Sequence, residues 1–98
     1  MFAVLYRWRI DPDREDAFRQ GWELVTRAIH RSCGSHGSRL HRADDGTWIA
    51  YALWPDAATR ERCDHAEDEG RRLMAEAVVE RFPETTMTVA SDLLHAPA

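Results

Sequence analysis

Hydrophobic and polar positions alternate at the start of the chain, over residues 2–10. One side of this stretch carries five large apolar residues, Phe2, Val4, Tyr6, Trp8 and Ile10. A period of two predicts a β-strand. Asp11 and Pro12 then end the strand and begin a helix, because aspartate is a favoured N-cap and proline suits the first helical position.

The apolar period changes after Pro12. A single stripe recurs at helical spacing, formed by Phe18, Trp22, Val25 and Ile29. This spacing predicts an amphipathic helix that runs to about Ser32. Residues 33–37 (Cys-Gly-Ser-His-Gly) then break it. Residues 38–43 and 47–54 predict two strands of a hairpin, joined by a tight turn at Asp44-Asp45-Gly46.

Pro55 and Asp56 end the hairpin and begin a second helical region, which residues 64–69 could interrupt. Its apolar stripe consists of Leu73, Met74, Ala77, Val78 and Phe82. Residues 85–94, rich in threonine and valine, predict a last strand. We therefore expect one domain over residues 1–95 and a frayed tail at 96–98.

The predicted order of elements is β-α-β-β-α-β, an α+β class. Right-handed crossovers then give a ferredoxin-like sandwich, in which two helices cover one face of a four-stranded antiparallel sheet. The strand at 48–54 is apolar on both sides, although a sheet covered on one face should alternate. A second copy of the sheet is the simplest cover, so we expect a homodimer. The alternative is a monomer with an exposed apolar patch.

Composition excludes several functions for this chain of 98 residues with a formal net charge of −4. Every basic residue is an arginine, and no basic stripe exists that could neutralise a run of phosphates, so no nucleic acid is expected. No apolar stretch is long enough to span a bilayer, and the N-terminus lacks a secretion signal, so no membrane and a cytoplasmic location are expected. In that compartment Cys33 and Cys63 are expected to be reduced thiols rather than a disulfide.

Other motifs are missing. The spacing of the histidines and cysteines repeats nowhere, so no metal site is expected. No glycine-rich phosphate loop or hydrolase elbow occurs, which argues against nucleotide and hydrolase chemistry.

Two segments carry a family resemblance. They are residues 34–42, Gly-Ser-His-Gly-Ser-Arg-Leu-His-Arg, and residues 45–55, Asp-Gly-Thr-Trp-Ile-Ala-Tyr-Ala-Leu-Trp-Pro. With the order and lengths of the elements, they resemble the antibiotic biosynthesis monooxygenase family. The resemblance implies a dimeric α/β barrel with a small pocket in each subunit between sheet and helices. It also implies oxidation of electron-rich phenols or quinols by O₂ with no bound cofactor.

The haem-degrading members of the same superfamily use an asparagine, a tryptophan and a histidine of the second helix. This chain has no asparagine at all, so that triad cannot be complete. His65 is the nearest candidate for the histidine, and we include it among the substrate-binding candidates.

Cofactor-free oxygenation needs a base near pH 7 and a dry pocket. His41, within the second predicted strand, is the preferred base, and Tyr51 is the second catalytic candidate because its hydroxyl can bind an oxygen atom. The alternative for His41 is a half-exposed position at a sheet edge.

Aromatic residues are the candidates for binding an aromatic substrate. They are Tyr6, Trp8, Trp22, Trp48 and Trp54. Trp48 and Trp54 share one face of their strand and Tyr51 lies on the other, but the face that meets the helices is undecided. Plain core and dimer packing is the alternative for each ring.

Arg7 and Arg9 share one face of the first strand. They would bind a phenolate or carboxylate, or form salt bridges with Asp92 or with an acid of the dimer mate, which we favour.

The function expected from these residues is a monooxygenase that oxidises a small electron-rich aromatic molecule with O₂. The alternatives are a non-catalytic dimeric protein, either one that binds a small molecule or a stress-related one, and a purely structural module.

Overall fold

The computed structural model describes residues 1–64 and 67–95. The chain begins with strand β1 (Phe2–Ile10), a 3₁₀ turn (Pro12–Arg14) and helix α1 (Glu15–Cys33). The hairpin of β2 (Gly37–Arg42) and β3 (Trp48–Trp54) follows, and then helices α2 (Ala57–Glu61) and α3 (Asp68–Ala77). Strands β4 (Val78–Arg81) and β5 (Thr85–Thr88) complete the sheet.

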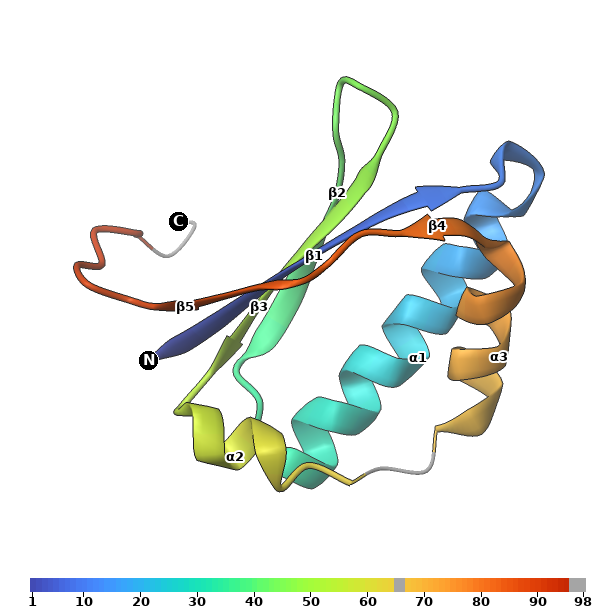
Figure 1. Cartoon of the computed structure of the whole chain (residues 1–98). Helices are drawn as coiled ribbons and strands as arrows, with labels where there is room; N and C mark the ends of the chain where they lie inside the picture. Colours follow the sequence, from blue (N-terminus) through green and yellow to red (C-terminus); the bar gives the residue numbers. More distant parts are fainter. Residues whose placement is uncertain (65–66, 96–98) are drawn as a thin grey trace.

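The sheet is antiparallel throughout, with the order β2-β3-β1-β4. β5 also pairs with β1, farther along the edge that β4 occupies. Helices α1 and α3 lie side by side over one face of this sheet (Figure 1). The predicted ferredoxin-like α+β arrangement is therefore confirmed, with the fourth strand divided into β4 and β5.

Local signals explain the first half of the fold. The Asp11 carboxylate accepts a hydrogen bond from the Asp13 amide at the start of the helical segment. Helix α1 ends at Cys33, and the next residue, Gly34, adopts a φ of 75° and donates its N–H to the His30 carbonyl. In the hairpin turn, Gly46 has a φ of 87°. Glycine adopts this left-handed conformation without the steric cost that a side chain imposes.

The second half differs from the sequence prediction at two boundaries. Val78 was expected on the apolar stripe of the second helix, as was Phe82. The helix instead ends at Ala77, and Val78 begins a strand opposite Ile10. In the strand, backbone N–H and C=O groups from Val78 onward pair with the open edge of β1. This pairing outweighs the helical pattern of apolar residues, which reflects only the local sequence. The expected last strand, 85–94, is also wrong in length, since it ends at Thr88.

Strand register decides which side chains face the helices. Trp8 lies opposite Trp48, and Tyr6 lies opposite Ala50, so the even positions of β1 and β3 share a face. Trp8 and Trp48 both pack edge-on against Phe18 of α1, with ring centroids 5.1 and 5.8 Å apart. Phe18 is fully buried. This helix-covered face therefore holds the core.

The opposite face carries Arg7 and Arg9 together with apolar residues. Arg7 binds Asp45 at 3.2 Å and Arg9 binds Glu80 at 3.4 Å. Both guanidinium groups also lie over the ring of Phe82. The favoured salt-bridge interpretation is therefore correct in kind, but the partners belong to the same chain and Asp92 is not one of them.

Cys33 and Cys63 form a disulfide, which corrects the expectation of two reduced thiols. Cys33 is the last residue of α1, and Cys63 follows α2. The β2–β3 hairpin returns the chain to that end of α1, so that the two Cα atoms lie 5.3 Å apart. A separation of 30 residues says nothing of this proximity.

Helices α1 and α3 approach each other closely at two glycines. A Cβ atom built on Gly21 would lie 2.6 Å from the carbonyl oxygen of Gly70, and one on Gly70 would lie 2.8 Å from that of Gly21. These distances exclude any side chain without a shift of the helices. No helix in the described ranges combines the length and apolar character needed to cross a membrane.

Candidate active site

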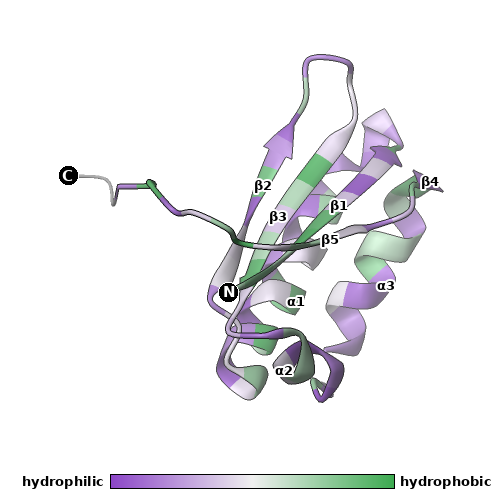
Figure 2. Ribbon diagram, turned by 60° about the vertical axis from the view of Figure 1, so that its left-hand side comes forward, coloured by the Kyte–Doolittle hydropathy of each residue, from purple (hydrophilic) through white to green (hydrophobic). Residues whose placement is uncertain are grey.

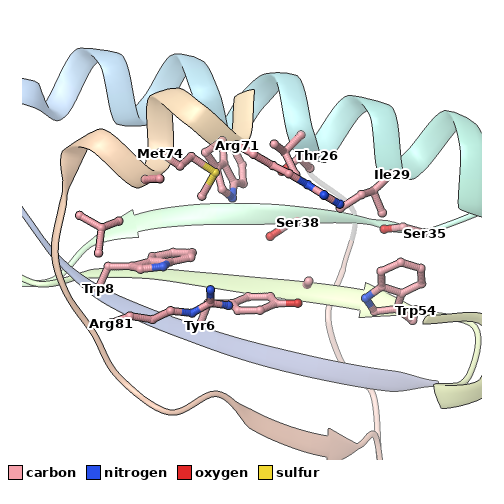
Figure 3. A pocket seen from close by; sticks show the side chains of 15 residues that line it. Tyr6, Trp8, Thr26, Ile29, Ser35, Ser38, Trp54, Arg71, Met74 and Arg81 are labelled. Carbon is pink, nitrogen blue, oxygen red and sulfur yellow. The ribbon is translucent and has the colours of Figure 1, made fainter. Parts of the chain in front are cut away.

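A cavity of about 580 Å³ lies between the sheet and helices α1 and α3 (Figure 3). Strand residues form its floor: Tyr6, Trp8, Ser38, Ala52, Trp54, Val78 and Arg81. Helical residues form its roof: Trp22, Val25, Thr26, Ile29, Arg71, Met74 and Ala75. Ser35, in the loop before β2, completes it. Its volume and mainly apolar walls are typical of a site for a small organic ligand.

The cavity brings together four of the aromatic residues proposed from the sequence. These are Tyr6, Trp8, Trp22 and Trp54. Tyr6 and Trp8 stack with an interplanar angle of 8° and a centroid distance of 5.8 Å. Two stacked rings present a flat aromatic surface, against which a planar ligand can pack.

Trp54 lies at the other end of the cavity floor and is only 3% exposed. Its indole Nε1 is buried and has no hydrogen-bond partner in the described part of the chain. Figure 3 shows this nitrogen turned toward the middle of the cavity, with the Tyr6 hydroxyl on the side facing Trp54. A buried unpaired N–H group costs about 1–3 kcal/mol, and a ligand acceptor would remove that cost.

The Tyr6 hydroxyl accepts a hydrogen bond at 3.2 Å from Arg60, which is not among the residues that line the cavity. Arg60 also donates to Glu84 at 2.7 Å. Burial by itself lowers the pKa of Arg60, but the hydrogen bonds to Glu84 and Tyr6 outweigh it and raise the pKa. With a permanent cation as donor, the Tyr6 oxygen accepts from Arg60 and its own proton can be donated into the cavity.

Trp48 shares the face of Trp54 but does not line the cavity. Its ring packs against Phe18, and its Nε1 donates a hydrogen bond to Glu15 at 3.2 Å. Arg42 lies over the ring and binds the same carboxylate. Trp48 is thus a core residue whose indole N–H is hydrogen-bonded, and core packing was the alternative interpretation of each tryptophan.

The two proposed catalytic residues lie on the other face of the sheet. His41 is opposite Ile49 and Tyr51 is opposite Leu5, all on the face that carries Arg7. His41 is exposed, and its Nδ1 lies 3.3 Å from the Ile49 carbonyl. Within one chain neither side chain reaches the cavity. His65, a proposed substrate-binding residue, falls outside the described residues, as do residues 96–98 of the expected tail.

Three arginines near the cavity were missed by the sequence interpretation. Arg71 and Arg81 line it, and Arg60 supports Tyr6. Alternation within the last strands could not reveal Arg81, because a register shift precedes it. Within residues 1–64 and 67–95, no three histidine, cysteine or acidic side chains gather as a metal-binding cluster.

Solved structures share this fold. SnoaB from Streptomyces nogalater, a cofactor-independent oxygenase, superposes with a TM-score of 0.78 at 13% identity, covering 96% of this chain and 97% of SnoaB. A Bordetella bronchiseptica protein, provisionally named an antibiotic biosynthesis monooxygenase, gives 0.73 at 21% identity over 92% and 97%. Rv0793 from Mycobacterium tuberculosis gives 0.74 at 15% identity over 95% and 98%.

These likenesses confirm the resemblance inferred from the sequence and establish the shared fold. By contrast, no family model matches the sequence. No curated protein matches it either.

Proposed function

We propose that this chain is a cofactor-independent monooxygenase that oxidises a small electron-rich aromatic molecule with O₂ in the cavity between sheet and helices. The observation that carries the proposal is the unpaired Nε1 of Trp54, buried in a pocket with aromatic walls. Such a donor suits the oxygen atom of a phenol or quinol. The fold shared with SnoaB supports the same class of reaction.

Each of these residues has a separate role in the proposed reaction. Stacked Tyr6 and Trp8 support the ring of the substrate, while Trp54 binds its oxygen and favours the deprotonated form, which is the form that reacts with O₂. The substrate supplies all four electrons, because its phenol ring is oxidised to a quinone. The ring forms one C–O bond to an oxygen atom of O₂ and loses two hydrogen atoms, and these leave with the other oxygen atom as water, so no resident redox group is required.

We further propose that the protein is a homodimer that joins through the face of the sheet turned away from the helices. Figure 2 shows the hydrophobic stretches of β1 and β3 in this sheet. Leu5, Ile49, Tyr51 and Leu53 lie on the uncovered face and are half-buried within one chain. A soluble protein seldom leaves such a face uncovered.

Oxygen uptake by the purified protein, with hydroquinones and polycyclic phenols, tests the activity. We expect Trp54→Phe to reduce kcat/KM at least about tenfold, because one hydrogen bond to a charged oxygen is lost. The variant should fold normally, since this N–H has no partner within the described chain.

His41→Ala is the informative companion variant. Uptake that survives this change but not Trp54→Phe would support chemistry within the cavity. Uptake that needs His41 would show that the base acts from the other face of the sheet. Full activity of Trp54→Phe would contradict the proposed role of Trp54.

Ligand binding without catalysis is the second candidate function. It is favoured by the absence of any histidine or carboxylate among the described residues that line the cavity. Saturable binding of aromatic compounds without oxygen uptake across the panel would support it over the oxygenase.

A further inference from the structure

The charged side chains that line the cavity in the described part of the chain are basic, although the protein is acidic. The charged residues on its wall are Arg71 and Arg81, and no acidic residue of the described chain lines it. The whole chain carries a formal net charge of −4. A local excess of positive charge next to an apolar cavity favours an anionic ligand.

A β-bulge directs Arg81 to the cavity. Ile10 pairs with Val78, and the next residue back on β1, Arg9, pairs with Glu80, so Val79 is an extra residue. If residues 78–81 alternated regularly, Glu80 would share the face of Val78. The bulge instead places Glu80 on the outer face and Arg81, opposite Trp8, on the inner face. Bulges re-aim side chains in this way, often beside active sites.

The acids nearest to Arg81 along the chain have other partners. Glu80 binds Arg9 on the outer face, and Glu84 binds Arg60. Arg81 is exposed, and its side chain makes no hydrogen bond or ion pair with the described part of the chain. Arg71 also lines the cavity but has an interaction of its own within the protein. Arg81 therefore presents an unneutralised guanidinium group at the cavity.

The two ends of the cavity differ in chemistry. Arg81 lies beside Trp8, whereas Trp54 pairs with Phe2, six residues back along β1. Figure 3 shows Tyr6 between the two ends. One end thus offers a guanidinium group for an anion, and the other offers the indole N–H for an oxygen atom.

We propose that the ligand of this cavity is an aromatic carboxylate, with its carboxylate bound by Arg81 and its ring oxygen bound by Trp54. A guanidinium group binds a carboxylate through two parallel hydrogen bonds, which orients the ligand as well as holding it. This inference rests on the proposed function and adds the class of substrate.

Matched pairs of ligands test the proposal without turnover. Carboxylates of naphthalene and of anthraquinone, and their methyl esters, are titrated against the protein by calorimetry. We expect each acid to bind about tenfold more tightly than its ester, as one charge-assisted contact implies. Added salt should weaken the acids only.

Arg81→Gln should abolish the preference for the acid and leave affinity for the ester unchanged, so that binding of the ester reports the intact fold. Arg31→Gln is the matched control. Arg31 is exposed on α1 and does not line the cavity, and its loss removes the same charge. It should retain the preference.

Each result separates this inference from the proposed function. Equal affinity for acid and ester, or an unchanged preference in Arg81→Gln, overturns the inference and leaves the aromatic site standing. Failure of every acid and every ester to bind overturns both.

Discussion

At the scale of single residues, two tryptophans of one strand differ in whether the indole N–H is hydrogen-bonded. Trp48 and Trp54 face the same side of β3, yet Trp48 donates its N–H to Glu15 and Trp54 donates to no described residue. A buried donor is almost always paired in a folded protein. The exception at Trp54 therefore identifies a position that stability alone does not explain.

The disulfide gives a prediction at the same scale. Replacing Cys33 and Cys63 together by serine should lower the free energy of unfolding by about 3 kcal/mol, because the bond closes a loop with 30 residues of sequence separation in the unfolded chain. Urea denaturation of both proteins measures the difference.

Dithiothreitol supplies the control for this experiment. It should shift the midpoint of the wild-type protein to that of the double variant and leave the variant unaffected. A wild-type urea midpoint that does not change when the reductant is added would contradict the presence of the disulfide. The bond also bears on location, since disulfides persist mainly in oxidising compartments; the cytoplasmic location stays a prediction.

Single residues also mark how far the sequence could predict the site. Parity along the strands correctly separated Tyr51 from Trp54, but it could not say which face the helices cover. That face depends on the packing of α1, so His41 and Tyr51 were grouped with rings that lie across the sheet from them. Arg81 could not be assigned, because an extra residue reverses the alternation before it.

At the scale of elements, periodicity predicted the order and most boundaries of the fold. It failed where a local pattern competed with a distant partner. The helical stripe continues through Val78, but the edge of β1 offers hydrogen bonds that the helix cannot match at that point. Glycine contacts between helices are equally non-local.

Packing between α1 and α3 leads to a prediction for those glycines. Gly21→Ala should destabilise the protein by about 1–3 kcal/mol, because the new methyl group would collide with the backbone of α3. Alanine normally stabilises a helix relative to glycine, so the sign of the change is informative. Thermal unfolding followed by circular dichroism measures it.

Gly70→Ala should act in the same direction, since its Cβ would meet the backbone of α1. Gln20→Ala, at the exposed neighbour of Gly21 in the same helix, is the control and should change little. A stabilised Gly21→Ala variant would mean that the helices do not approach as closely as described.

At the scale of the whole molecule, two uncovered apolar regions of the described chain bear on assembly. One is the open face of the sheet around Leu5 and Tyr51. The other is the segment after β5, which extends from the body in Figure 1 and exposes Leu93 and Leu94, at 87% and 83%. A partner chain that covered both would remove this surface from water, in keeping with the proposed dimer.

Sedimentation of the protein at micromolar concentration tests that assembly. We expect a dimer, and we expect Leu5→Glu to produce monomers, because a carboxylate at this position would lose its hydration on assembly. Arg19→Glu, an exposed change on α1, should sediment like the wild type. A monomeric wild-type protein would refute the dimer.

The bulge in β4 has a consequence for how such proteins could diverge. Loss of the single codon for Val79 would remove the extra residue and leave Glu80 opposite Arg9 and Arg81 opposite Trp8, so both side chains would keep their present faces. A shift of the strand by one residue after Val78 would instead pair Val79 with Arg9, which would turn Glu80 inward and Arg81 outward. A relative of this protein could thus reverse the charge that β4 presents to the cavity by a change of register, with no charged residue replaced.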